Sequence, residues 1–269
     1  HRTGDRILAE IAGRIAVWAP SAAILARVGG DEFTIVHRID AARRLREADV
    51  ERLISALTEP YSTAPSARIG ASIGVHTTER LDLREMLLHA DAALSAAKTH
   101  GDNTFYFFDD ELRDSLQRRQ DVERDIPAAI GKGELTAWFQ PVVRLDRLEV
   151  VGFEALLRWT HPVHGPIPPP EIVAAARQTG VVRSVTEMVF ANCCDLVATL
   201  NRTGERRMKV AMNMSPFELE VTDVEATILA ELRGRNLSTD QFEIEITEEA
   251  SLDYARVRGN LRRLSGAGI

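Results

Sequence analysis

Oxygen-bearing side chains stand at the ends of three apolar, β-rich segments in the second half of the sequence. Glu154 follows Val-Val-Gly-Phe, Asn213 follows Val-Ala-Met, and Glu245 follows Phe-Glu-Ile. In a barrel of alternating strands and helices, polar side chains at the carboxyl ends of strands converge on one mouth. Carboxylate and amide oxygens suit Mg²⁺ or Mn²⁺ better than zinc. The three residues together therefore predict a divalent-cation site, although any one of them alone is better explained as an ordinary polar strand end.

A second candidate site is the sequence Gly-Gly-Asp-Glu at 29–32, which separates two short β-rich segments. Glycines at a hairpin tip let the backbone approach a phosphate closely, because they carry no Cβ. Asp31 and Glu32 are then placed to hold Mg²⁺ together with nucleotide phosphate oxygens. The spacing alone also fits a plain acidic turn, since such turns are common.

Alternating helical and β-rich patterns surround both candidate sites and predict an α/β protein. In the first half, helices are expected over 4–18, 49–58 and 83–99, and strands over 24–28, 33–37, 67–76 and 105–108. In the second half, strands are expected over 137–143, 148–156, 209–214 and 242–246, and helices over 170–178, 184–200 and 224–233. The strand-then-helix order of the second half favours a parallel sheet, with a (β/α) barrel as the leading candidate. Between the halves, the mixed charges of 109–120 are typical of a solvated linker helix.

The bulk composition narrows the possible partners. A chain of 269 residues with a formal net charge of -7 indicates two domains, and it lacks the basic excess with which proteins grip a nucleic-acid polymer. A small phosphorylated ligand stays possible. The cysteines, Cys193 and Cys194, are adjacent in an apolar stretch and are expected to be buried free thiols of a cytoplasmic protein. A longer parent protein could still be anchored to a membrane through segments upstream of this sequence.

The first half resembles the diguanylate cyclase (GGDEF) family. The resemblance rests on Ala-Arg-Val-Gly-Gly-Asp-Glu-Phe at 26–33 and, in the family's order, on the stretches 1–8, 70–75 and 90–98. It implies a homodimer in which paired domains condense GTP into cyclic di-GMP. It also implies these roles: Gly29 and Gly30 bind the nucleotide, Asp31 binds metal, Glu32 supports catalysis, Asp5 contacts guanine and Lys98 contacts phosphate.

Two departures from the family pattern bear on this activity. Asp102 stands where the family usually has a phosphate-binding Arg, and a carboxylate repels a triphosphate. The family's earlier strand, with another metal ligand and a guanine contact, would precede His1. A domain that binds GTP as a regulator, without turnover, is therefore the alternative.

The second half resembles the EAL phosphodiesterase family. Glu-Ala-Leu-Leu-Arg-Trp at 154–159 matches its motif, with Phe-Gln-Pro at 139–141 before it and Asn-Met-Ser at 213–215 and Glu-Ile-Thr-Glu at 245–248 after it. The resemblance implies hydrolysis of cyclic di-GMP to the linear dinucleotide with Mg²⁺ or Mn²⁺. It assigns Glu154, Asn213 and Glu245 as metal ligands, Glu154 and Glu248 to catalysis, and Gln140 and Arg158 to ligand contacts.

The expected architecture is thus a partial, nucleotide-cyclase-like GGDEF domain over 1–108, the linker, and the first part of an EAL-type (β/α) barrel over 121–269. The barrel is expected to be cut short, because about 250 residues are typical of a complete one. This piece alone is therefore expected to be inactive. His161 and His164, in a Pro-rich loop, are expected to be structural. A different class of function stays open, in which the chain is a non-catalytic receptor or scaffold for cyclic di-GMP.

Overall fold

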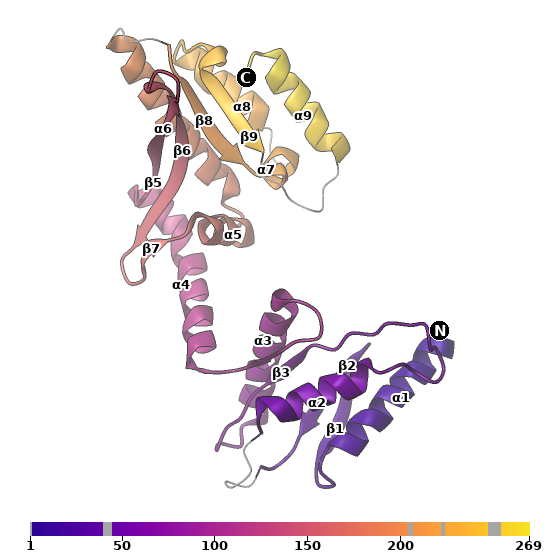
Figure 1. Ribbon diagram of the computed structural model, residues 1–269. Helices are drawn as coiled ribbons and strands as arrows, with labels where there is room; N and C mark the ends of the chain where they lie inside the picture. The colour runs from indigo at the N-terminus through magenta and orange to yellow at the C-terminus, as the bar shows by residue number, and fades with distance from the viewer. Residues whose placement is uncertain (1, 40–44, 204–206, 222–223, 247–253) are drawn as a thin grey trace. The chain divides into compact units, whose positions relative to one another are not determined.

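The computed structural model describes residues 2–39, 45–203, 207–221, 224–246 and 254–269 (Figure 1). The chain divides into two compact units, His1–Ser115 and Leu116–Ile269. None of the helices within the described ranges is long and apolar enough to cross a membrane.

The first unit contains two small sheets. Strands β1 and β2 form an antiparallel hairpin, and β3 and β4 pair in parallel. Ile15, Leu53 and Leu57 form the centre of its core. The strand expected over 67–76 is limited to Ile73–Val75, which pair with Phe105–Phe107. The backbone N–H of Ala71 donates instead to the Asn103 side chain, at 2.9 Å. The elements are α1 (Arg2–Trp18), β1 (Ile24–Gly29), β2 (Glu32–Val36), α2 (Glu47–Thr58), β3 (Ile73–Val75), α3 (Leu83–His100) and β4 (Phe105–Phe107).

The second unit is built on a five-stranded sheet in the order β5-β6-β8-β9, with β7 also paired to β6. The predicted parallel order holds for β6, β8 and β9, whereas β5 runs antiparallel to β6. The reason is that only 145–148 separate these two strands, too few residues for a crossover connection. The sheet is open, so the expected barrel is not closed. The elements are α4 (Asp110–Lys132), which begins in the first unit, β5 (Leu135–Arg144), β6 (Glu149–His161), β7 (Gly165–Ile167), α5 (Pro169–Thr179), α6 (Val182–Arg202), β8 (Lys209–Met214), α7 (Pro216–Val221), α8 (Val224–Gly234), a 3₁₀ turn (Thr239–Gln241), β9 (Phe242–Ile246) and α9 (Tyr254–Gly266).

Strand alternation gives this sheet one apolar and one open face. Ala155, Trp159, Val210, Met212 and Phe242 point into a buried core that they share with residues of α4, α5, α6 and α8. The residues of the same strands that alternate with these point to the other side. Burial of the apolar face holds the strands on the helices and thereby fixes which side chains stay on the open face.

His161 and His164 join the β6–β7 hairpin to α4. The Nε2 atom of His161 lies 3.1 Å from an Asp125 carboxylate oxygen, and that of His164 lies 3.0 Å from Asp121. His161 is 2% exposed, and its Nδ1 accepts the backbone N–H groups of Val163 and His164. His161 closes β6 rather than lying in a loop, and these contacts account for both rings as structural groups.

Gly152 is the position at which we expect the sheet to be most sensitive to a single added methyl group. A Cβ at Gly152 would lie 2.7 Å from the backbone carbonyl oxygen of Lys209 on the neighbouring strand. Gly152→Ala is expected to destabilise the second unit by about 1–3 kcal/mol, because β8 must move. Chemical denaturation followed by circular dichroism and tryptophan fluorescence measures the change.

The matched control is Gly131→Ala in α4, where no heavy atom would lie within 4 Å of the new Cβ. It is expected to be neutral or stabilising by about 0.5–1 kcal/mol, because alanine favours the helix. Equal unfolding midpoints for the two variants would contradict the close approach of β6 and β8.

Candidate functional site

Glu154, Asn213 and Glu245 lie side by side on the open face of the second unit's sheet. Glu154 of β6 pairs in register with Ala211 of β8, and Asn213 of β8 pairs with Glu245 of β9. The Asn213 Nδ2 atom donates a hydrogen bond to Glu154 Oε1, at 2.7 Å. The fold therefore brings these three residues together across adjacent strands.

The two carboxylates of this cluster, Glu154 and Glu245, repel each other. Partial burial, then the carboxylate of Glu154 and that of Glu243, raise the pKa of Glu245 above its ordinary value. A divalent cation between Glu154 and Glu245 would relieve this repulsion. The donor set thus fits a hard cation, provided that the Asn213 amide turns to present its oxygen in place of its NH₂ group. No three His, Cys, Asp or Glu side chains in the described ranges could hold an ion by themselves.

The predicted ligand-contact residues border the cluster. Gln140 of β5 is exposed and lies directly opposite Glu154 in the antiparallel ladder. Arg158 lies on the same face, four residues beyond Glu154 on β6, and its Nη1 donates to the backbone carbonyl of Leu157, at 3.0 Å. Glu248 lies outside the described residues.

Trp138 of β5 also lies on this open face, and no sequence motif singled it out. It is opposite Leu156 and is 64% exposed. The alternation of side chains along a strand could have identified it, because Trp138 is two residues before Gln140 and therefore points to the same side.

The Gly-Gly-Asp-Glu turn forms the tip of the β1–β2 hairpin, as expected. Gly30 has a φ of 50°, a backbone conformation that favours glycine. The Arg27 side chain braces the turn, with its Nε donating to the Gly30 carbonyl at 2.9 Å. Gly29 pairs with Glu32 in register, and Asp31 is exposed at the tip.

Lys98 is the predicted site residue that the fold brings to this hairpin. Its Nζ atom lies 3.7 Å from Glu32 Oε1, and both side chains are more than half exposed, so the ion pair is weak. Asp102 is exposed just beyond α3. Asp5 is exposed in the first turn of α1, and among the contacts of the described residues none joins it to the hairpin or to Lys98.

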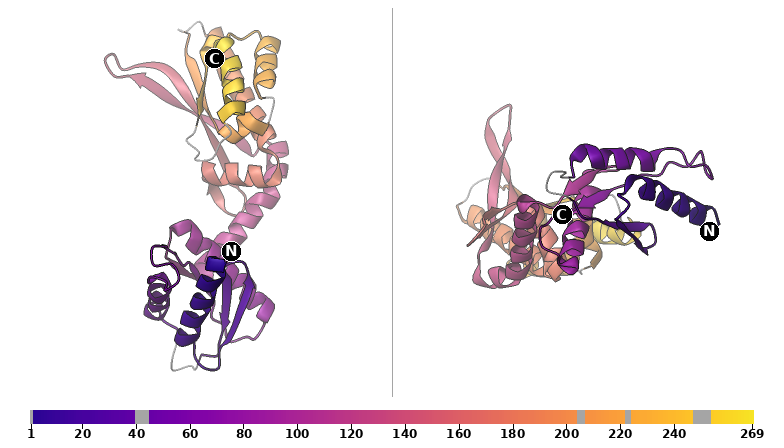
Figure 2. Two further views of the ribbon diagram at one scale, coloured as in Figure 1. Left: turned by 90° about the vertical axis from the view of Figure 1, so that its right-hand side faces the viewer. Right: turned by 90° about the horizontal axis from the view of Figure 1, so that it is seen from below.

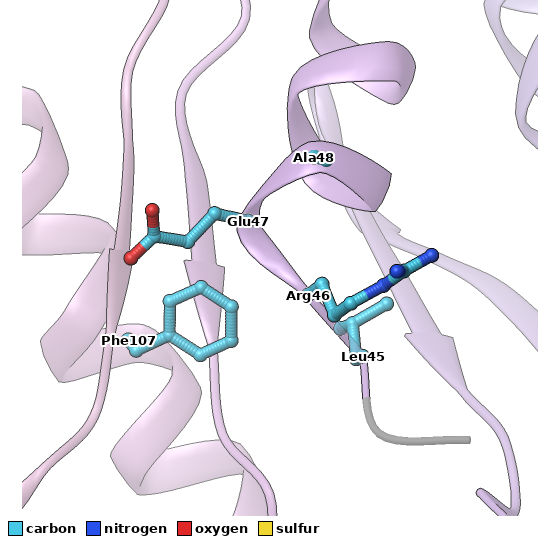
Figure 3. A pocket seen from close by; sticks show the side chains of 5 residues that line it. All are labelled: Leu45, Arg46, Glu47, Ala48 and Phe107. Carbon is cyan, nitrogen blue, oxygen red and sulfur yellow. The ribbon is translucent and has the colours of Figure 1, made fainter.

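A hollow of about 490 Å³ in the first unit lies between α2 and β4 (Figure 3). In Figure 3 the ring of Phe107 lies near the Glu47 carboxylate. None of the predicted site residues lines this hollow, so it is separate from the hairpin site. Its lining consists of Leu45, Arg46, Glu47, Ala48 and Phe107.

Comparison with known proteins matches residues 123–269 to the EAL domain and residues 1–104 to the diguanylate cyclase GGDEF domain. An uncharacterized signaling protein of Caulobacter vibrioides is 34% identical over all of this chain, which covers 33% of that relative. The bifunctional diguanylate cyclase/cyclic di-GMP phosphodiesterase MucR of Pseudomonas aeruginosa is 29% identical over all of this chain, which covers 40% of MucR.

Among solved structures, the MucR phosphodiesterase in complex with c-di-GMP matches with a TM-score of 0.52 and 27% identity. The match covers 55% of this chain and 61% of that structure. The chain spans between 30% and 40% of the length of the first curated relatives that it matches.

The charge of Glu245 gives a testable pH dependence. A carboxyl group whose pKa is raised by folding contributes stability that is present below its unfolded pKa and is lost as the pH rises through the folded pKa. Glu245→Gln is therefore expected to raise the melting temperature of the metal-free protein at pH 7. The difference should vanish below the ordinary pKa of 4.5, where both side chains are neutral.

Thermal melts over a pH series, with and without Mg²⁺, test this expectation. Mg²⁺ should stabilise the wild type and have little effect on Glu245→Gln. Glu187→Gln, which alters an acid on α6 outside the cluster, is the control and should keep the response to Mg²⁺. If Mg²⁺ leaves the melting temperature of the wild type unchanged, the result counts against a cation site at Glu245.

Proposed function

Because the chain belongs to the EAL domain family and its first part matches a GGDEF domain, we propose that the protein hydrolyses cyclic di-GMP to the linear dinucleotide. The observation that carries this proposal is the Asn213–Glu154 contact beside Glu245, on the open face of one sheet. The name of the MucR relative, and the c-di-GMP complex of its phosphodiesterase, support the choice of ligand.

Each residue of the cluster has a role in this reaction. Glu154, Asn213 and Glu245 would hold Mg²⁺ or Mn²⁺, which when bound would polarise the phosphodiester and activate water. The guanidinium of Arg158 pairs with the phosphate, because its planar fork matches two phosphate oxygens. Gln140 offers an amide to the ligand from across the β5–β6 ladder. We assign Glu248 as a supporting acid.

The first unit is proposed to bind GTP at the β1–β2 hairpin. Asp31 and Glu32 would bind Mg²⁺ there, and Lys98 would contact a phosphate group. Gly29 and Gly30 leave room for the phosphates at the turn. Whether this unit also condenses two GTP molecules into cyclic di-GMP depends on Asp102, whose negative charge opposes a triphosphate. Condensation would require a homodimer, since each copy would present one nucleotide.

A second candidate function is a receptor that binds cyclic di-GMP without turnover. It is favoured by the small number of acids brought together: only Glu154 and Glu245, with the Asn213 amide, meet at the proposed cation position among the described residues. Turnover by the wild type would exclude the receptor.

Glu154→Ala tests the proposed hydrolysis directly. In the natural full-length protein with Mg²⁺, this variant is expected to lower the rate of cyclic di-GMP hydrolysis more than about a hundredfold, since it removes a ligand rather than a supporting group. Glu187→Ala on the outer helix α6 is the control and should retain activity. Chromatographic assay of the linear product gives the rates, and undiminished turnover by Glu154→Ala would reject the assignment.

The role of the first unit is tested in the Glu154→Ala background, where any cyclic di-GMP formed is not consumed. Incubation with GTP and Mg²⁺ is expected to yield cyclic di-GMP if this unit is a cyclase, and a second change, Asp31→Ala, should then abolish the product. If the unit is a regulator, GTP gives no product but changes the hydrolysis rate of the wild type. If GTP yields no cyclic di-GMP and also leaves the hydrolysis rate of the wild type unchanged, both roles are contradicted.

A further inference from the structure

Trp138 is an exposed tryptophan of β5, between two residues that face the core. Its neighbours in sequence, Ala137 and Phe139, point into the core, whereas Trp138 is 64% exposed on the open face. The other tryptophans differ from it: Trp159 is 2% exposed, and Trp18 donates its Nε1–H to the Asp49 carbonyl. A large aromatic ring at such a position is free to contact a ligand.

The register of β5 and β6 places this ring among the proposed ligand contacts. Trp138 pairs with Leu156, between the Gln140–Glu154 pair and the Thr136–Arg158 pair. Residues two positions apart on a strand are separated by about 7 Å, and diagonal cross-strand neighbours are within reach of an aromatic side chain. Glu154 and Arg158 are both diagonal neighbours of Trp138.

The surroundings of Trp138 argue against an apolar docking patch. On its own strand and face it is flanked by Thr136 and Gln140, which are polar and exposed. A surface for another protein would present a continuous apolar area. The exposed apolar residues Leu145 and Leu148 lie instead at the turn of the β5–β6 hairpin, which projects away from the rest of its unit (Figure 2).

We propose that Trp138 is a stacking platform for a guanine base of cyclic di-GMP. This inference rests on the proposed function and adds a ligand-binding residue to it. In a nucleotide the flat base is held one sugar away from its phosphate. An indole on the same face as Arg158 and Glu154 can therefore receive the base while those residues receive the phosphodiester.

Equilibrium binding of cyclic di-GMP to the natural full-length protein, measured in EDTA to prevent hydrolysis, tests the platform. Trp138→Ala is expected to weaken binding about 5- to 150-fold, the effect of removing one base-stacking ring. Trp138→Phe should recover most of the affinity, because it keeps an aromatic face. Leu145→Ala, 87% exposed at the hairpin turn, is the control and should bind normally.

Tryptophan fluorescence gives a second readout. Cyclic di-GMP should quench the wild type, and the quenching should disappear in Trp138→Phe, in which Trp18 and Trp159 remain as internal references. Circular dichroism of Trp138→Ala should match the wild type, since the ring is exposed.

Normal binding by Trp138→Ala, or quenching that is unchanged in Trp138→Phe, would overturn the stacking role alone. A wild type that binds cyclic di-GMP neither in EDTA nor with Mg²⁺, and that gives no linear product with Mg²⁺, would overturn both the platform and the proposed function.

Discussion

The alternation of side chains along the strands of the second unit is the constraint on which its chemistry depends. One face of the sheet is held against helices by a core that includes Ala155, Val210, Met212 and Phe242. The residues of the same strands that alternate with these are thereby committed to the other face. A shift of one residue in register would exchange the two sets and place carboxylates in the core, at a high cost in free energy. The hydrophobic core thus selects the register, and the register assembles the candidate site.

The carboxylates of the candidate site repel each other. Partial burial of Glu245, together with the like charge of Glu154, raises the pKa of Glu245 above its ordinary value. The amide of Asn213 satisfies one Glu154 oxygen and lies between the two acids in strand order. Such a cluster is poorly suited to a purely structural role, whereas it suits a bound cation. The hairpin site of the first unit is different, because its acids are exposed at a turn tip and only the Lys98–Glu32 pair constrains them.

Much of this molecule could be predicted from local sequence. The hairpin around Gly29 and Gly30, the helices α1, α2, α3, α5, α6 and α8, and the parallel order of β6, β8 and β9 follow from periodicity and turn residues. Glu154, Asn213 and Glu245 could be identified from their motifs. The strands that carry them follow one another in the sheet in the same order as in the chain. The roles of these residues, and of Gln140, Arg158 and Asp31, stay predictions until the variants are measured.

The sequence by itself determined the two-part α/β organisation and the family resemblance, and it predicted which residues bind a cation or a phosphate. Only the tertiary structure decided the antiparallel entry of β5, the shortness of β3, the anchoring of His161 and His164 on α4, and the exposure of Trp138 beside Arg158. The physical reason is range. Propensity and spacing act over a few residues, whereas pairing partners and exposure are set by contacts between segments far apart in the chain.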